Sequence, residues 1–129
     1  MIQVSIVIPY YKENQKIYLW MQRRSSSDSL DGLLEFPGGK KEENESSLAT
    51  AIREVKEEVG IDIETKNTRF VGEHNAKIVS LSLYLNDNMD LWPKEGWVEI
   101  NDKCLESLEI PPENKLFLPR ILESIKSAI

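Results

Sequence analysis

The chain has 129 residues, a formal net charge of −6 at neutral pH and a hydrophobic fraction of 40%. These values fit one globular domain, residues 1–129, with enough apolar side chains to build its own core. The negative net charge argues against a protein that coats duplex nucleic acid, because such binding depends on neutralising phosphates.

Two further absences in the sequence restrict the class of protein. The N-terminal region has no basic segment followed by an apolar run, and no stretch is long and apolar enough to span a bilayer. Cys104 is the only cysteine, so an intrachain disulfide cannot form. We therefore expect a cytoplasmic protein without a membrane partner, either a monomer or a homodimer.

Alternating and β-branched residues predict the strands, taken in chain order. Residues 2–8 and 16–23 form one expected pair, joined by a polar turn around Glu13, Asn14 and Gln15. Residues 68–73 and 77–85 form a second pair, and 97–100 a further short strand. A helix is expected from about residue 114 to 127, with Pro119 either at its first position or at a kink.

The clearest helix is predicted at about residues 46 to 59. Its apolar residues recur at steps of four, three and four, as on one helical face: Leu48, Ile52, Val55 and Val59. Ser46 is in the position of an N-cap, and Gly60 follows the last periodic residue, where a left-handed backbone is favoured.

Three glutamates gather on this helix in an arrangement that opposes its stability. Glu54, Glu57 and Glu58 are surface neighbours at i,i+3 and i,i+4, and two of them lie in the last turn, where the helix dipole disfavours anions. A bound divalent cation removes both penalties, since hard cations such as Mg²⁺ prefer oxygen ligands. Arg53 is placed to hold Glu57 at i,i+4.

The alternative interpretation of these glutamates is a solvated acidic helix face, which is common in proteins. The preceding segment favours the metal site. Residues 34–39 are a short apolar stretch that ends in Gly38 and Gly39, and two glycines let the backbone approach a ligand and expose its carbonyl groups.

The complete pattern resembles the Nudix box, here residues 39–61, at every defined position. The matching residues are Gly39, Glu45, Arg53, Glu54, Val55, Glu57, Glu58, Gly60 and Ile61. Three flanking segments resemble the MutT-like branch of that family: residues 34–40, Gln22 to Arg24, and Pro111 to Asn114. The similarity covers nearly the whole chain, and the box is its most specific part.

The resemblance implies a fold of the α/β (α+β) class, an α/β/α sandwich around a mixed central sheet. It implies a hydrolase of a nucleoside diphosphate linked to another group, with Mg²⁺ as the cofactor and Mn²⁺ as an alternative. The implied metal ligands are the three helix glutamates and the Gly39 carbonyl. Glu45 would organise the loop and helix, and Arg53 would orient a glutamate.

The resemblance also implies substrate contacts outside the box. Arg23, Arg24 and Lys40 would grip the phosphates, and Glu35 belongs to the same substrate-binding set. Asn114 matches the position that reads a purine edge, for which an amide offers both a donor and an acceptor. The alternative role for Asn114 is a helix N-cap.

The general base is less defined than the ligands. The resemblance implies a glutamate in the loop before a strand tryptophan, and Glu95 lies two residues before Trp97. Glu99 is expected in the following strand, and Glu95 could instead be a solvated loop residue. Glu57 is the next candidate if Glu95 does not reach the metal.

We therefore expect an enzyme that hydrolyses a nucleoside triphosphate to a nucleoside monophosphate and pyrophosphate, with an oxidised purine nucleotide such as 8-oxo-dGTP as one candidate. The alternative substrates are a nucleotide sugar, a dinucleoside polyphosphate or an RNA 5′ end. A non-catalytic Nudix module that only binds its ligand is disfavoured, because all four box glutamates are present.

Overall fold

The structure is a computed structural model that describes residues 1–25 and 27–127. It contains two α-helices, eight strands and three short 3₁₀ turns within these residues. In chain order the strands and helices are β1 (Ile2–Glu13), β2 (Lys16–Trp20), β3 (Gln22–Arg23), β4 (Leu34–Glu35), β5 (Gly38–Lys40), α1 (Ser47–Val59), β6 (Thr68–Ala76), β7 (Val79–Asn86), β8 (Trp97–Ile100) and α2 (Pro112–Ser127).

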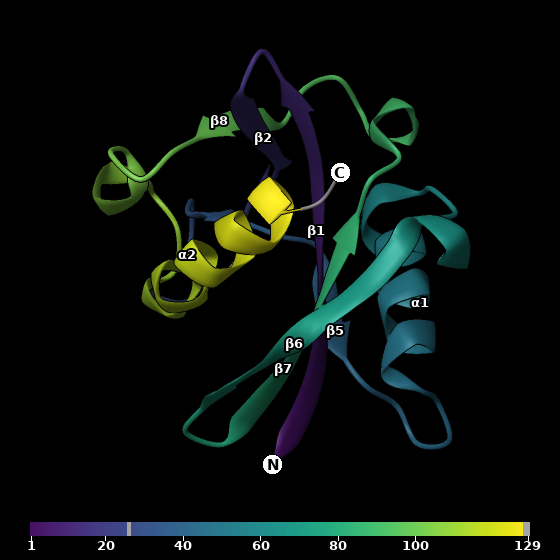
Figure 1. Ribbon diagram of the computed structural model, residues 1–129. Helices are drawn as coiled ribbons and strands as arrows, with labels where there is room; N and C mark the ends of the chain where they lie inside the picture. The colour runs from purple at the N-terminus through teal and green to yellow at the C-terminus, as the bar shows by residue number, and fades with distance from the viewer. Residues whose placement is uncertain (26, 128–129) are drawn as a thin grey trace.

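A mixed sheet forms the middle of the molecule. Its strand order is β6-β7-β1-β2-β8, and β5 also pairs with β1. The β1–β7 pairing is parallel, with Ile2 opposite Val79, and the other pairings are antiparallel. β3 and β4 form a separate two-stranded sheet. Figure 1 shows α1 and α2 on opposite sides of the central strands.

Each helix covers its own hydrophobic core, so both faces of the sheet are buried. Under α1, Val55 packs in a cluster with Val7 of β1 and Tyr84 of β7. Under α2, Phe117 packs in a second cluster with Ile8 of β1. Consecutive residues of β1 therefore point into different cores, as the alternation of a strand requires. The expected α/β/α sandwich with a mixed sheet is confirmed.

The first hairpin has the expected turn, with different strand ends. Asn14 and Gln15 both have positive φ, 52° and 67°, as in the two-residue turns that match the twist of a hairpin. β1 continues to Glu13, five residues beyond the predicted end. The predicted strand 16–23 is divided, because β2 ends at Trp20 and β3 pairs with β4 instead.

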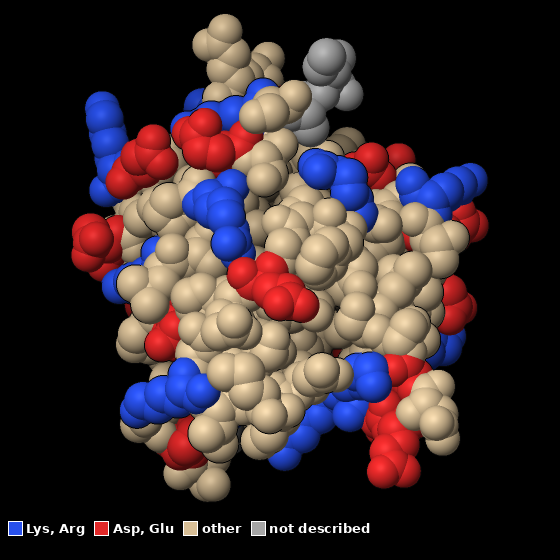
Figure 2. Space-filling view, turned by 60° about the horizontal axis from the view of Figure 1, so that its bottom comes forward, with Lys and Arg blue, Asp and Glu red and all other residues tan. Residues whose placement is uncertain are grey.

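The second hairpin and the last strand agree with the sequence prediction. β6 pairs with β7 antiparallel, and β8 spans the predicted residues and pairs with β2. No helix in the described residues is long and apolar enough to cross a membrane. On the face presented in Figure 2, Lys and Arg side chains alternate with Asp and Glu without an extended basic patch.

The C-terminal helix begins earlier than predicted. α2 starts at Pro112 instead of 114, because proline is well tolerated in the first turn, where its missing N–H has no helical partner. Asn114 is thus inside the first turn, and its predicted N-cap alternative is wrong. Pro119 lies within the helix, so its predicted placement at the first helical position is also wrong.

Candidate active site

Helix α1 positions the box glutamates and is capped at both ends by its own sequence. The Ser46 hydroxyl accepts a hydrogen bond from the Ala49 N–H at 3.0 Å, which confirms it as the N-cap. Gly60 has a φ of 81° and its N–H donates to the Lys56 carbonyl, as expected of a left-handed C-terminal cap. Local residues therefore fix both ends of the helix that carries the glutamates.

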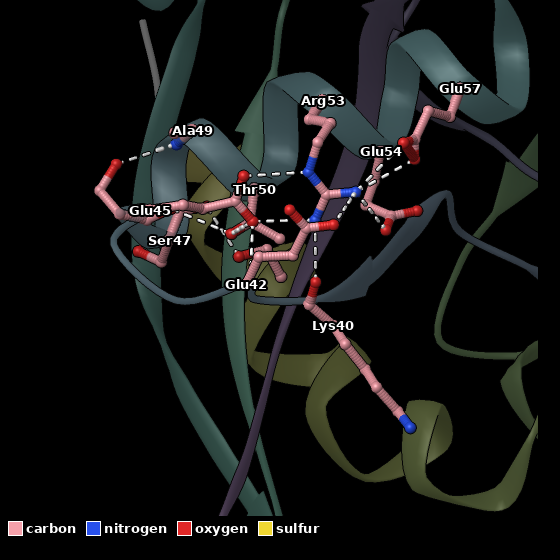
Figure 3. A network of polar contacts seen from close by, with 11 residues as sticks. Lys40, Glu42, Glu45, Ser47, Ala49, Thr50, Arg53, Glu54 and Glu57 are labelled. Atoms are coloured by element: carbon pink, nitrogen blue, oxygen red, sulfur yellow. Dashed lines mark hydrogen bonds and ion pairs between the residues drawn. The ribbon is translucent and has the colours of Figure 1, made fainter.

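Arg53 is the centre of the polar network at the site (Figure 3). Its Nε donates to Glu45 Oε2 at 2.9 Å and its Nη2 to Glu45 Oε1 at 2.8 Å. Its Nη1 donates to Glu54 Oε1 at 3.0 Å and to Glu57 Oε2 at 3.1 Å. Nη2 also reaches the Lys40 carbonyl at 3.0 Å. One guanidinium thus joins the loop before α1, the helix and the end of β5.

The Glu45 carboxylate is held charged by these contacts. Hydrogen bonds from Arg53, then from the Glu42 N–H and the Thr50 hydroxyl, lower the pKa of Glu45 to about 2. The same pairing raises the pKa of Arg53 further above its usual range. Glu45 is therefore a structural partner of Arg53, in agreement with the organising role that the sequence implied.

Gly38 and Gly39 are in strand β5, which lies directly against two of the helix glutamates. A Cβ atom added at Gly39 would be 2.3 Å from the Glu54 carboxyl carbon, and one at Gly38 would be 2.1 Å from the Ser5 carbonyl oxygen. The Gly38 N–H donates to Glu58 Oε2 at 2.9 Å. Only glycine allows this approach, which brings the backbone of β5 beside the carboxylates.

Glu58 has an environment that disfavours its charge. Loss of water around its carboxyl group raises the pKa of Glu58 to about 7, and the charges of Glu54 and Glu35 act in the same direction. The hydrogen bonds from Gly38 and Gln22 oppose this effect. The residue as a whole is exposed, although its carboxyl group lies against β5 through the Gly38 N–H.

The donor set of this region suits a hard divalent cation. Carboxylates from Glu54, Glu57 and Glu58 and the backbone carbonyl groups of the two β5 glycines are all oxygen ligands, and the glycines leave room where a side chain would overlap Glu54. Within residues 1–25 and 27–127, no three acidic, histidine or cysteine side chains already converge as a metal centre. Arg53 supplies the positive charge between Glu54 and Glu57 in this arrangement.

The two predicted phosphate-binding arginines both have acidic partners. Arg24 pairs with Glu35 at 3.1 Å and with Asp28 at 3.0 Å. Arg23 donates to the Gly32 carbonyl at 2.9 Å and lies 3.6 Å from Glu109. The backbone carbonyl of Lys40 belongs to the Arg53 network, whereas the ammonium group of the Lys40 side chain points away from that network in Figure 3.

Glu95 and Asn114 lie outside this network. The loop before β8 is fastened beside β2, since Trp20 Nε1 donates to the Glu95 carbonyl at 2.8 Å and the Met21 N–H to the Gly96 carbonyl at 3.0 Å. The Glu95 carboxylate is exposed and makes no polar contact with another described residue. Asn114 lies at the start of α2, beside the Glu113 that bonds His74 at 2.7 Å.

Sequence reasoning missed two contacts of Glu58, with Gln22 and with the Gly38 N–H. Gln22 Nε2 donates to Glu58 Oε1 at 3.3 Å from a strand far away in the chain. Only strand register brings Gln22 there, and no local pattern encodes it. The Gly38 contact had a signal, because a second glycine beside Gly39 indicates an additional close approach.

Comparison with known proteins identifies the family of the chain. A family model described as the NUDIX domain matches residues 1–116. An 8-oxo-dGTP diphosphatase of Haemophilus influenzae is 29% identical over 119 residues, which covers 86% of each chain. A CTP pyrophosphohydrolase of Escherichia coli is 34% identical over 83 residues, covering 64% of this chain and 58% of the relative.

A solved structure has the same fold. It comes from a study of MutT from Aliivibrio salmonicida and Vibrio cholerae, and it matches with a TM-score of 0.69 and 23% identity. The match covers 95% of this chain and 98% of the other. At that identity the likeness concerns the fold alone.

Proposed function

Because the chain belongs to the Nudix family, whose domain model matches residues 1–116, we propose that it is a Mg²⁺-dependent nucleoside triphosphate pyrophosphohydrolase. It would release a nucleoside monophosphate and pyrophosphate. The family and the relatives support a pyrophosphohydrolase activity. The metal and the substrate are the parts that we propose. Mn²⁺ is the alternative metal.

The observation that carries this proposal is the contact between the two glycines of β5 and the helix glutamates. Gly39 leaves no room for a side chain in front of Glu54, and the Gly38 N–H holds Glu58. A solvated acidic face requires neither glycine. A cation site uses carboxylates together with backbone carbonyl groups, and the glycines bring the two close to each other.

The residues divide into ligands and supports. Glu54, Glu57, Glu58 and the Gly39 carbonyl are the proposed ligands, and Mg²⁺ bound there would neutralise phosphate charge and lower the pKa of a bound water. Arg53 holds Glu54 and Glu57 by the hydrogen bonds of its Nη1. Glu45 fixes Arg53 in turn. Arg53 and Glu45 thus hold the proposed ligand carboxylates in a fixed orientation.

In the proposed reaction a water oxygen bonds to one phosphorus as the phosphoanhydride bond to the leaving pyrophosphate breaks. A carboxylate takes the proton that the water loses. Glu95 is our first candidate because its carboxylate is exposed and engaged by no described residue. The box glutamates are the second candidates, Glu57 first among them because its side chain is the more exposed, at 56% against 18% for Glu54.

The substrate contacts are proposed from the flanking segments. Arg23, Arg24 and Lys40 would bind the phosphates, with Glu35 fixing the direction of the Arg24 guanidinium at 3.1 Å. Asn114 would read the edge of the base with its amide. An oxidised purine nucleotide is the first substrate to test, since the Haemophilus relative named above is an 8-oxo-dGTP diphosphatase. CTP is the second, because the Escherichia coli relative is a CTP pyrophosphohydrolase.

The test is a product-resolved activity screen with and without Mg²⁺. The panel contains 8-oxo-dGTP, the ordinary nucleoside triphosphates including CTP, a nucleotide sugar, a dinucleoside polyphosphate and a 5′-triphosphate RNA. We expect pyrophosphate from a triphosphate only when metal is present. A sugar phosphate or a shortened RNA as the sole product would replace this substrate class by another.

A glutamate variant separates catalysis from simple binding. Glu57→Gln is expected to lose turnover, because it removes one proposed ligand while keeping nearly the same shape. Unchanged turnover by this variant would remove Glu57 from the metal site. Ligand binding without turnover by the wild-type protein, over the whole panel, would indicate a binding module instead of an enzyme.

A further inference from the structure

A cavity of about 350 Å³, with no box carboxylate in its lining, lies between the end of β1, the 3₁₀ turn at Met89–Leu91 and the start of β8. Its most buried lining residue is Trp92, which belongs to the hydrophobic cluster under α1. The cavity therefore lies on the same side of the sheet as α1, next to the part that α1 covers. Nothing in the proposed hydrolysis uses it.

The aromatic wall of this cavity is rigid. Tyr11 meets Trp97 edge to face, with ring centroids 4.8 Å apart and an interplanar angle of 77°. Tyr11 is also stacked on Tyr18, with centroids 4.7 Å apart. β1, β2 and β8 fix these rings through the sheet, with Tyr11 opposite Tyr18 in the register. A ligand that contacts them does not have to order them first.

The charges around the wall favour a cation. Glu13 and Asp90 line the cavity, both are exposed, and neither forms an ion pair with any residue in the described ranges. Burial, then Tyr18, then the Glu13 charge raise the pKa of Tyr11, so this carboxylate acts directly on the aromatic wall. Lys94 is the single basic residue of the lining, which leaves one excess negative charge.

We propose that this cavity binds a small methylated or quaternary ammonium cation. The faces of aromatic rings attract such cations electrostatically, and the two carboxylates supply the opposite charge. A bare ammonium or metal ion is too strongly hydrated for a wall of rings, and hard metal ions need more oxygen ligands than two side chains offer. A neutral aromatic ligand leaves both carboxylates without a partner.

The test compares choline with its neutral carbon isostere, 3,3-dimethylbutan-1-ol. The two have the same shape and differ in the charge, and the tryptophan indole N–H signals report binding by NMR without any nucleotide. We expect choline to shift the Trp97 signal in a saturable manner and the isostere to bind at least about ten-fold more weakly. Equal binding of the two, or no saturable shift with choline, overturns the proposal.

Charge variants identify the site. Glu13→Gln combined with Asp90→Asn should weaken choline binding several-fold, whereas Lys94→Gln should strengthen it. Glu43→Gln is the matched control, because Glu43 is an exposed glutamate outside this cavity. A response of the control equal to half or more of that of the double variant would mean general charge attraction and overturn the site.

Removal of the ring tests the aromatic part. Trp97→Leu, with binding read from the Trp92 indole signal, should abolish choline binding if the variant keeps the thermal transition of the wild type, and binding that persists in the folded variant contradicts the proposal. If that variant does not fold, the charge variants decide the matter alone. Because no readout involves hydrolysis, failure here leaves the proposed function untouched.

Discussion

Arg53 and Glu45 form a bidentate pair, with Nε to Oε2 at 2.9 Å and Nη2 to Oε1 at 2.8 Å. The pair ties the loop before α1 to the middle of the helix and leaves Nη1 for Glu54 and Glu57. The planar fork of arginine makes this division possible, because a lysine ammonium cannot serve four acceptors in fixed directions. The geometry of the proposed metal ligands thus depends on a residue that is not itself a ligand.

Arg53→Lys should therefore lower kcat by roughly 10- to 100-fold, the usual effect of losing a group that orients metal ligands. The charge is retained, so a loss of activity reports lost geometry. Steady-state kinetics with the best nucleotide from the screen measure the effect. Arg69→Lys is the control, as Arg69 is an exposed residue of β6 outside the network. Wild-type kcat in Arg53→Lys would contradict the orienting role.

Gly39→Ala and Gly60→Ala should affect different properties although the substitution is the same. A methyl group at Gly39 would lie 2.3 Å from the Glu54 carboxyl carbon, so Glu54 must move and activity should fall. Gly60 has open space around it but a φ of 81°, so alanine there costs about 1–2 kcal/mol of stability and spares the site. Thermal unfolding and kcat, measured on both variants, distinguish the two cases. Full activity of Gly39→Ala would show that the close approach of β5 to Glu54 is not needed.

Glu58→Gln should respond differently with and without metal. Without metal, the substitution should leave the unfolding temperature near pH 8 unchanged or raise it. Loss of water, with the Glu54 and Glu35 charges, raises the pKa of Glu58 to about 7, so the charged form that exists at pH 8 is disfavoured in the folded protein. Mg²⁺ at about a hundred-fold excess over its Kd should stabilise the wild type by about 2.7 kcal/mol. The variant should gain much less. An equal gain for both proteins would remove Glu58 from the ligand set.

The Glu45 pair should give the protein an acid-dependent stability. The folded pKa of Glu45 is about 2, below its ordinary value of 4.5, so its contribution is complete above pH 4.5 and is lost as the pH falls towards 2. The difference in unfolding temperature between wild type and Glu45→Gln should be constant above about pH 5 and shrink below it. Glu43→Gln, an exposed glutamate without an ion pair among the described residues, should show no such window. A constant difference at all pH values would contradict the pairing.

Glu95→Gln decides which carboxylate takes the proton. If Glu95 is the general base, kcat should fall by roughly 10²- to 10⁴-fold, with little change in the Mg²⁺ concentration that gives half-maximal activity. Stability should not change, since the carboxylate contacts no described residue. A variant with nearly wild-type kcat would transfer the role to a box glutamate.

The parts of the fold that sequence predicted are those encoded by neighbouring residues. Ser46 and Gly60 mark the ends of α1 because capping depends on residues within one turn. The hairpin turn at Asn14 and Gln15 was evident for the same reason, since a two-residue turn is a local structure. The spacing within the box is likewise local, and it places Glu54, Glu57 and Glu58 on one helix.

The parts that sequence did not predict depend on distant partners. β3 and β4 have two residues each, too few to show a period, and they exist only because they pair with each other. The bond between Gln22 and Glu58 requires the strand register and the helix position together. The i,i+4 spacing indicated Glu57 as a partner of Arg53, and Arg53 does bond Glu57. The bidentate partner, however, is Glu45. Glu45 lies in a loop, and residue spacing does not reveal the path of a loop.

The parallel pairing of β1 with β7 also affects how the chain folds. Ile2, near the start of the chain, pairs with Val79, so the central strand lacks one neighbour until more than half of the protein has been synthesised. Pairing between residues so far apart closes a long loop and slows folding. The nascent chain therefore carries a long strand with an open edge, which is prone to aggregation. Substitutions in β7 should therefore change expression yield at different translation speeds as well as equilibrium stability, since Leu83 and Leu85 of this strand are also buried in the core.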